Sequence, residues 1–131
     1  MASPLHILVV EDNPVNQKLL VLMLRQFGYT SDIAENGKVG LELYAMNSYD
    51  MILMDIQMPH MDGFEATAAI RAGETTTGKH IPIIAVTAHV MPGYREKCLT
   101  SGMDNYLAKP FRMQDLKDVI LETLQQTNAP N

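Results

Sequence analysis

The sequence predicts an α/β domain built on an open, doubly wound parallel sheet with helices on both faces. Short apolar runs of strand length alternate with stretches whose apolar residues recur at the three- and four-residue spacing of an amphipathic helix. The chain has 131 residues, too few for an eight-fold barrel of alternating strands and helices. Strict alternation in so short a chain therefore favours the open sheet.

Five segments are expected to form the strands. Three of them are nearly continuous apolar runs, as in parallel strands buried on both faces, and two are weaker. The strong runs are residues 5–10, 51–54 and 81–86, and the weaker ones are residues 30–34 and 105–107.

Five helices are expected between and after these strands. Asn13 and Pro14 provide a cap and a first-turn proline for the first helix, which ends before Gly28. The apolar residues of this helix recur at three- and four-residue steps, and they are Val15, Leu19, Leu20, Leu22, Met23 and Phe27. Further helices are expected after Asn36, from Gly63, and over residues 92–100 and 113–125, and the polar segment 73–79 is expected to be a loop.

Composition excludes several classes of function. Ten basic residues against fifteen acidic ones give a net charge of -5, and no basic cluster exists that could bind a run of phosphates, so direct nucleic-acid binding is not expected. Cys98 is the single cysteine, which excludes an intramolecular disulfide and a cysteine-rich metal site. No apolar run approaches the roughly 20 residues of a bilayer span, so we expect no membrane contact by this domain and a cytoplasmic location.

Acidic residues mark two of the strand ends. Glu11 and Asp12 follow the first strand, and Asp55 follows the third. Ligands of open parallel sheets bind beyond the carboxyl ends of the strands, so these acids are expected to converge. Three close carboxylates require a cation, and an all-oxygen site suits Mg²⁺. The alternative is that each acid merely caps the helix that follows it.

The last two strands end in groups that phosphoryl chemistry requires. Thr87 supplies a hydroxyl after the fourth strand, and Lys109 supplies an ammonium group after the fifth. A phosphoryl group on Asp55 would then meet charge and a hydroxyl from several sides. A cis bond between Lys109 and Pro110 would offer a way to turn the lysine into the pocket. Alternatively, Thr87 is a turn hydroxyl and Lys109 a solvated surface lysine.

These residues lie in motifs that resemble the receiver domains of two-component response regulators, over residues 5–125. The matching segments are ILVVEDNPVNQ at 7–17, MILMDIQMPHMDGFEA at 51–66, IPIIAVTAH at 81–89 and NYLAKPF at 105–111. The first two are most similar to receivers of hybrid sensor histidine kinases. The resemblance implies a flavodoxin-like sheet of five strands in the order 2-1-3-4-5, with five helices on its two faces.

The resemblance also implies a metal-dependent phosphorylation site. Asp55 would be phosphorylated from a phosphohistidine in a reaction that requires Mg²⁺, with Mn²⁺ as the alternative ion. Glu11, Asp12 and Asp55 would hold the metal together with the backbone carbonyl of Gln57. His89, like Gln57, would occupy a variable position that influences hydrolysis of the acyl phosphate, although simple exposure at the rim of the site is the favoured interpretation of this histidine.

A conformational switch is implied as well. Thr87 would follow the phosphoryl group inward, Lys109 would pair with it, and Tyr106 would change rotamer as Thr87 moves. The partners implied are a sensor histidine kinase, a histidine phosphotransfer domain or both, for a monomer or weak dimer. Whether the domain switches its own surface or passes the phosphoryl group onward stays open.

Three other functions are alternatives to phosphoryl acceptance. A phosphatase of the haloacid dehalogenase kind requires a second acid two residues after its nucleophile, where this sequence has Gln57. A flavin or nucleotide carrier requires a glycine-rich loop after the first strand, where the acids stand. A docking module that works without phosphorylation would not require the intact acidic set. The domain is therefore expected not to be an enzyme beyond assisting its own phosphorylation and dephosphorylation.

The expected domain limits follow from the same alignment of motifs. Residues 1–4 are expected to form an N-terminal leader, residues 5–126 the receiver domain and residues 127–131 a C-terminal tail. We expect no DNA-binding or enzymatic output domain within these residues. We expect either a free-standing receiver or a piece of a larger protein, such as the cytoplasmic part of a membrane-bound hybrid kinase.

Overall fold

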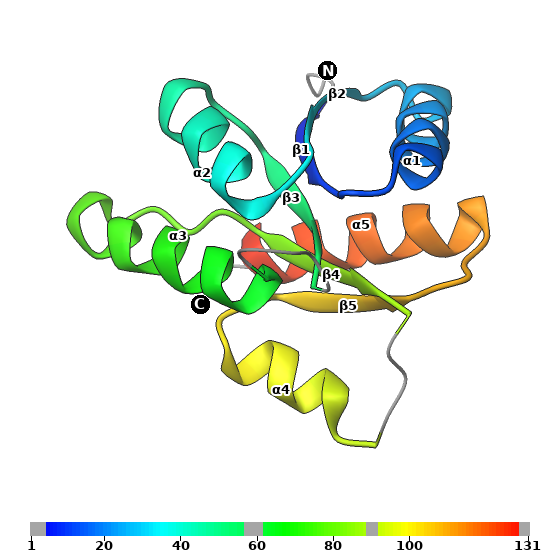
Figure 1. Ribbon diagram of the computed structural model, residues 1–131. Helices are drawn as coiled ribbons and strands as arrows, with labels where there is room; N and C mark the ends of the chain where they lie inside the picture. The colour runs from blue at the N-terminus through cyan, green and yellow to red at the C-terminus, as the bar shows by residue number, and fades with distance from the viewer. Residues whose placement is uncertain (1–4, 57–61, 89–91, 129–131) are drawn as a thin grey trace.

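The computed structural model of the chain describes residues 5–56, 62–88 and 92–128. Within these ranges, five strands alternate with five helices, and all the strands belong to one sheet (Figure 1). The strands are β1 His6–Val10, β2 Thr30–Ala34, β3 Met51–Asp55, β4 Ile83–Thr87 and β5 Asn105–Ala108. The helices are α1 Pro14–Gln26, α2 Gly37–Met46, α3 Gly63–Thr77, α4 Tyr94–Thr100 and α5 Met113–Asn128.

The sheet has the order β2-β1-β3-β4-β5, and each pair of neighbouring strands is parallel. The predicted fold class and strand order are therefore confirmed. Because all strands run the same way, their carboxyl ends lie at one edge of the sheet and their amino ends at the other. We call these the carboxyl edge and the amino edge.

Two layers of apolar side chains cover the sheet, because successive strand residues point to opposite faces. Leu8 and Val10 pack in the layer beneath α2, α3 and α4, whereas Ile7 and Val9 pack in the layer beneath α1 and α5. Figure 1 shows the sheet lying between these helices. No helix in the described part of the chain has the length and apolar character needed to cross a membrane.

The structure corrects two expected helix limits. The segment 73–79 is not a loop, since α3 continues to Thr77 and ends at Gly78, which has a left-handed backbone with φ of 72°. The hydroxyls of Thr75 and Thr76 donate to the carbonyls of Ala72 and Gly73, one turn back along the helix. Their hydrogen bonds are therefore made within the helix itself. Helix α5 reaches Asn128, three residues beyond the expected end at residue 125.

The expected helix α1 is confirmed, and its apolar residues divide between two faces. Leu20 and Leu24 are buried against the sheet. Val15, Leu19 and Leu22 point outward and are 73%, 45% and 56% exposed. The helix therefore carries more apolar residues than its core face can bury, and the excess forms an apolar strip on its outer side.

Candidate functional site

Three acids meet at the carboxyl edge. Glu11 follows β1 and is buried, Asp55 is the last residue of β3 and is 6% exposed, and Asp12 is exposed. One carboxylate oxygen from each residue lies within 4.8 Å of the others. The acids thus lie together, as their positions at neighbouring strand ends predict.

Local backbone contacts hold Glu11 in place. The Glu11 amide donates to the carbonyl of Ala34 at the end of β2, and a Glu11 side-chain oxygen accepts from the amide of Asn13. Asn13 in turn caps α1, because its side-chain oxygen accepts from the amides of Val15 and Asn16. The start of α1 therefore positions the carboxylate of Glu11, which precedes this helix.

Gly63 lets α3 approach the end of β3, and the importance of this contact was not seen in the sequence. A Cβ atom at residue 63 would lie 2.6 Å from the backbone oxygen of Asp55 and 2.9 Å from Cα of Ile56, closer than real side chains come. Asp62 and Glu65 form a capping box at the same point. A Gly-to-Ala change would force the helix away from Asp55. No local pattern in one sequence distinguishes this glycine from an ordinary turn glycine.

Lys109 reaches the acids from the end of β5. Its Nζ lies 2.9 Å from Oε1 of Glu11 and 3.8 Å from Oδ2 of Asp55, so Glu11 is its nearer partner. The Lys109–Pro110 peptide bond is cis, the isomer considered from the sequence. Sequence reasoning placed Lys109 against a phosphoryl group on Asp55 and did not identify its contact with Glu11.

The lysine changes the chemistry of Glu11. Burial raises the pKa of this carboxyl, but the hydrogen bonds from Lys109 and from the Asn13 amide, together with the lysine charge, outweigh burial and lower the pKa below its ordinary value. Glu11 is therefore a carboxylate at neutral pH even though it is buried. It keeps the charge that a metal ligand requires.

Thr87 and Tyr106 lie on neighbouring strands next to this cluster. Thr87 is the last residue of β4 and is fully buried, and its carbonyl accepts from the amide of Lys109. Tyr106 of β5 pairs with Ala85 of β4, whereas Thr87 of β4 pairs with Ala108 of β5. Because Tyr106 lies two residues before Ala108, the side chains of Tyr106 and Thr87 are on the same face of the sheet. The structure thus brings together the two residues assigned to the switch. Gln57 and His89 lie outside the described residues.

The donor set fits a hard divalent cation. All three acids offer carboxylate oxygens, which are the ligands Mg²⁺ prefers, and a site with few protein ligands suits an ion that keeps several waters. Lys109 contributes one positive charge against three carboxylates. Two of the three acids are buried, where unbalanced negative charge is costly, so a cation at this place would be strongly favoured.

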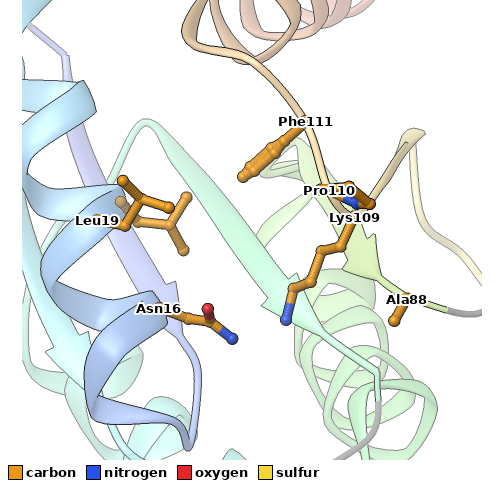
Figure 2. A pocket seen from close by; sticks show the side chains of 7 residues that line it. Asn16, Leu19, Ala88, Lys109, Pro110 and Phe111 are labelled. Atoms are coloured by element: carbon orange, nitrogen blue, oxygen red, sulfur yellow. The ribbon is translucent and has the colours of Figure 1, made fainter.

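A pocket of about 350 Å³ lies beside the acids, between α1 and the start of the loop after β5. Figure 2 shows Leu19 and Asn16 on one side and Lys109, Pro110 and Phe111 on the other. The full lining is Asn16, Leu19, Leu20, Ala88, Lys109, Pro110 and Phe111. The sequence did not predict this pocket.

The structure is a flavodoxin-like domain with a cluster of three acids, which could hold a metal ion, at the carboxyl edge of its sheet. Residues 7–121 match the family model of the response regulator receiver domain. The chain therefore belongs to the response regulator receiver domain family.

The proteins most informative about the kind of receiver are receiver domains of sensor histidine kinases. Over 122 residues, 89% of this chain, the sequence is 50% identical to hybrid signal transduction histidine kinase I of Dictyostelium discoideum, but the chain spans only 7% of that kinase. The crystal structure of the receiver domain of sensor histidine kinase PA1611 from Pseudomonas aeruginosa, with magnesium in its active-site cleft, is 43% identical with a TM-score of 0.81, covering 95% of this chain and 98% of that one.

A third comparison concerns a complex. The match is the receiver domain of the response regulator Ssk1 of Saccharomyces cerevisiae, solved in complex with the histidine phosphotransfer protein Ypd1. Its TM-score is 0.87 and its sequence identity is 30%. The match covers 98% of this chain and 95% of that chain. The chain is thus a receiver domain of the kind that works in phosphorelays, and its sequence relatives are receivers of hybrid kinases.

Proposed function

We propose that Asp55 is the phosphoryl acceptor of this receiver domain and that its donor is a phosphohistidine. The observation that carries the proposal is the meeting of Glu11, Asp12 and Asp55 within 4.8 Å, with Lys109 reaching in from β5. Similarity to a magnesium-bound receiver supports the choice of Mg²⁺ as the cation.

The transfer is balanced within the donor and the acceptor. A carboxylate oxygen of Asp55 forms a bond to phosphorus while the bond from phosphorus to the histidine nitrogen breaks, and the electron pair of that bond returns to the imidazole. Bound Mg²⁺, held by Glu11, Asp12 and Asp55, supplies positive charge that neutralises the phosphoryl oxygens. Lys109 supplies a second charge from 3.8 Å away, and Thr87 offers its hydroxyl. The protein thus positions groups for its own phosphorylation and turns over no separate substrate.

Two outcomes of phosphorylation are compatible with this site. The phosphoryl group can favour an inward Thr87 and a rotated Tyr106, which shifts the population of surface conformations. It can also pass onward to a second histidine. In both cases the partner must bring a histidine to the carboxyl edge.

The outer strip of α1 is the surface we assign to that partner. Val15, Leu19 and Leu22 are exposed apolar residues at helical spacing, and Leu19 also lines the pocket that contains Lys109. An amphipathic helix of a histidine phosphotransfer domain could cover this strip and place its histidine at Asp55. The match to a receiver solved with a phosphotransfer protein supports this kind of partner.

Two phosphoryl donors test the site and the surface separately. The protein is incubated with Mg²⁺ and either acetyl phosphate or a phosphorylated histidine phosphotransfer domain, and its intact mass is followed over time. We expect one phosphoryl adduct from both donors, none after metal chelation and none on Asp55→Asn. Asp118→Asn removes an exposed acid of α5 and should leave the adduct unchanged.

The surface is tested with Leu19→Asp. This variant should accept from acetyl phosphate at the wild-type rate but from the phosphotransfer domain about tenfold or more slowly, because it places a charge in an apolar contact. Met46→Asp, at an 80% exposed apolar residue of α2, is the matched control. An adduct that persists on Asp55→Asn would overturn the proposed acceptor, and equal loss with both donors would overturn the proposed surface.

A further inference from the structure

Three aromatic rings from three different elements meet beside the switch residues. The ring of Tyr94, the first residue of α4, meets the ring of Tyr106 on β5 at 6.4 Å between centroids, with an interplanar angle of 76°. Tyr94 also meets Phe64 of α3, at 6.1 Å between centroids and again at 76°. Tyr94 therefore contacts both of the other rings edge to face.

This row of rings begins and ends close to the phosphorylation site. Phe64 follows Gly63, the residue whose backbone packs against Asp55 and Ile56. Burial raises the pKa of the Tyr94 phenol, and the neighbouring Cys98 and Tyr106 raise it further, ahead of Asp62 and Asp55. The rings thus bridge the switch strand and the first turn of α3.

Helix α4 depends on such side-chain contacts for its position. It has seven residues, and the residue that precedes it, Gly93, provides no side-chain cap. Cys98 is its one buried residue, and Lys97 extends back over the rings, with its Nζ 4.9 Å from the Phe64 centroid and 5.9 Å from that of Tyr94. A short, uncapped helix held by few contacts can change position at low energetic cost.

We propose that Tyr94 is a positioning residue that couples the rotamer of Tyr106 to Phe64, and so links the phosphorylated state of Asp55 to the placement of α4 against α3. The inference rests on the proposed function, since it requires a phosphoryl group that Tyr106 can sense. Edge-to-face contacts depend on ring orientation, so a rotation of Tyr106 removes its contact with Tyr94 and changes the contact between Tyr94 and Phe64. The three rings then have two arrangements, and phosphorylation of Asp55 favours one of them.

Nuclear magnetic resonance tests the coupling directly. The protein is labelled at its aromatic rings and lysine side chains, and spectra are compared before and after addition of beryllofluoride and Mg²⁺. In the wild type, we expect the signals of Phe64 and of the Lys97 methylenes to move together with those of Tyr106. In Tyr94→Leu, Tyr106 should still respond, while the change at Phe64 falls to about a third or less of its wild-type size.

Two further variants separate coupling from simple loss of packing. Tyr94→Phe keeps the ring and should keep the response of Phe64, so a loss equal to that of Tyr94→Leu would overturn the ring-contact mechanism. Tyr49→Leu removes a tyrosine that stacks on His6 rather than on these rings, and should leave the response of Phe64 unchanged. A full response of Phe64 in Tyr94→Leu would also overturn the inference.

The result remains interpretable if Tyr94→Leu does not fold. Phe64→Leu removes the same contact from its other side, and there the Tyr94 ring should respond while the amides of Glu65 and Ala66 no longer do. A response of those amides at wild-type size would contradict the coupling. Intact mass with acetyl phosphate distinguishes the two proposals, because an adduct without any change at Tyr106 overturns the coupling alone, whereas absence of the adduct overturns the phosphorylation site.

Discussion

The two edges of the sheet both gather acids, but they treat the negative charge in different ways. At the carboxyl edge, Lys109 pairs with Glu11 and Asp55, and Asp12 adds a third negative charge. At the amino edge, Asp104 and Glu74 are both bound by Arg71, which lies 2.8 Å and 2.7 Å from them. The carboxyl edge therefore has an excess of negative charge that a cation could neutralise, whereas the two acids of the amino edge have an arginine partner in common.

Arg71 makes the amino edge a closed structural unit. Besides the two acids, its guanidinium donates to the carbonyls of Gly102 and Ile81, so it ties α3 to the segments before β4 and β5. The acids also accept from the backbone, because Glu74 takes the amide of Ile81 and Asp104 takes that of Ile83. The acids of this edge are held by contacts within the protein, whereas we propose that those of the carboxyl edge bind a cation.

Loss of Arg71 should have the largest effect on stability. Arg71→Met leaves Glu74 and Asp104 without their partner at a site where the arginine side chain is only 17% exposed, so we expect the free energy of unfolding to fall by about 3 kcal/mol. Urea denaturation followed by circular dichroism measures this change. Arg95→Met, at an exposed residue of α4, is the matched control and should change stability by less than about 0.5 kcal/mol.

A difference of under about 1 kcal/mol between these two variants would contradict the structural role of the amino edge. Arg71→Lys gives a finer test. A lysine keeps the charge but loses the planar fork that reaches two acids and two carbonyls, so an intermediate loss is expected. A lysine variant as stable as the wild type would show that charge alone, rather than the fork, holds this edge together.

The two edges also differ in how far the sequence could predict them. The carboxyl edge could be predicted because Glu11, Asp55 and Thr87 each occupy the end of a recognisable strand, and parallel strands bring such positions together. The unit around Arg71 could not be predicted. It joins a helix to two loops distant in sequence, and a lone arginine in an amphipathic helix reads as a surface residue.

Side-chain pairing and exposure were less predictable than position. The sequence placed Lys109 at the site but not on Glu11, because the choice between two close carboxylates depends on distances that only the folded chain defines. Helical spacing also could not separate the outward Leu19 from the buried Leu20, since α1 has apolar residues around much of its circumference.

A smaller effect is expected at the carboxyl edge, and its sign depends on the metal. Without a divalent cation, Asp12→Asn should raise the free energy of unfolding by about 0.5–1 kcal/mol, because it removes one of three mutually repelling charges. With Mg²⁺ at about a hundred times its dissociation constant, the wild type should gain about 2.7 kcal/mol. The variant should gain much less, so that the order of stability is reversed.

Urea denaturation in chelator and in Mg²⁺ measures both halves of this prediction. Glu42→Gln removes an exposed acid of α2 with the same change in net charge, and it should follow the wild type in both conditions. An Asp12→Asn variant that is less stable than the wild type in chelator would show that repulsion among the acids does not limit the stability of this edge.

The smallest expected effect on the free energy of unfolding comes from a hydrogen bond between Tyr49 and Asp32, near β1 and β2. This effect depends on pH and is not detectable at neutral pH. The Tyr49 hydroxyl donates to Oδ2 of Asp32 at 2.8 Å, and the same oxygen lies 3.1 Å from Nε2 of His6. Burial, followed by the hydrogen bond to Asp32 and its charge, raises the pKa of Tyr49 to about 12. In the unfolded chain a tyrosine ionises near pH 10, roughly its reference value. Between these values the unfolded state has lost a proton that the folded state keeps, so the free energy of unfolding should fall as pH rises from about 10 toward about 12.

Spectrophotometric titration of tyrosinate tests this last prediction. Tyr49→Phe should remove one phenol from the group that ionises near pH 12, and should weaken the alkaline loss of stability in urea denaturation. Asp32→Asn should lower the pKa of Tyr49, since it removes the charge that opposes ionisation. If the phenol lost in Tyr49→Phe is one that ionises near pH 10, the hydroxyl is not held by Asp32. Asp32 would then lack the hydrogen-bond donor that the structure gives it, and the contrast between the two edges would rest on the acids bound by Arg71 alone.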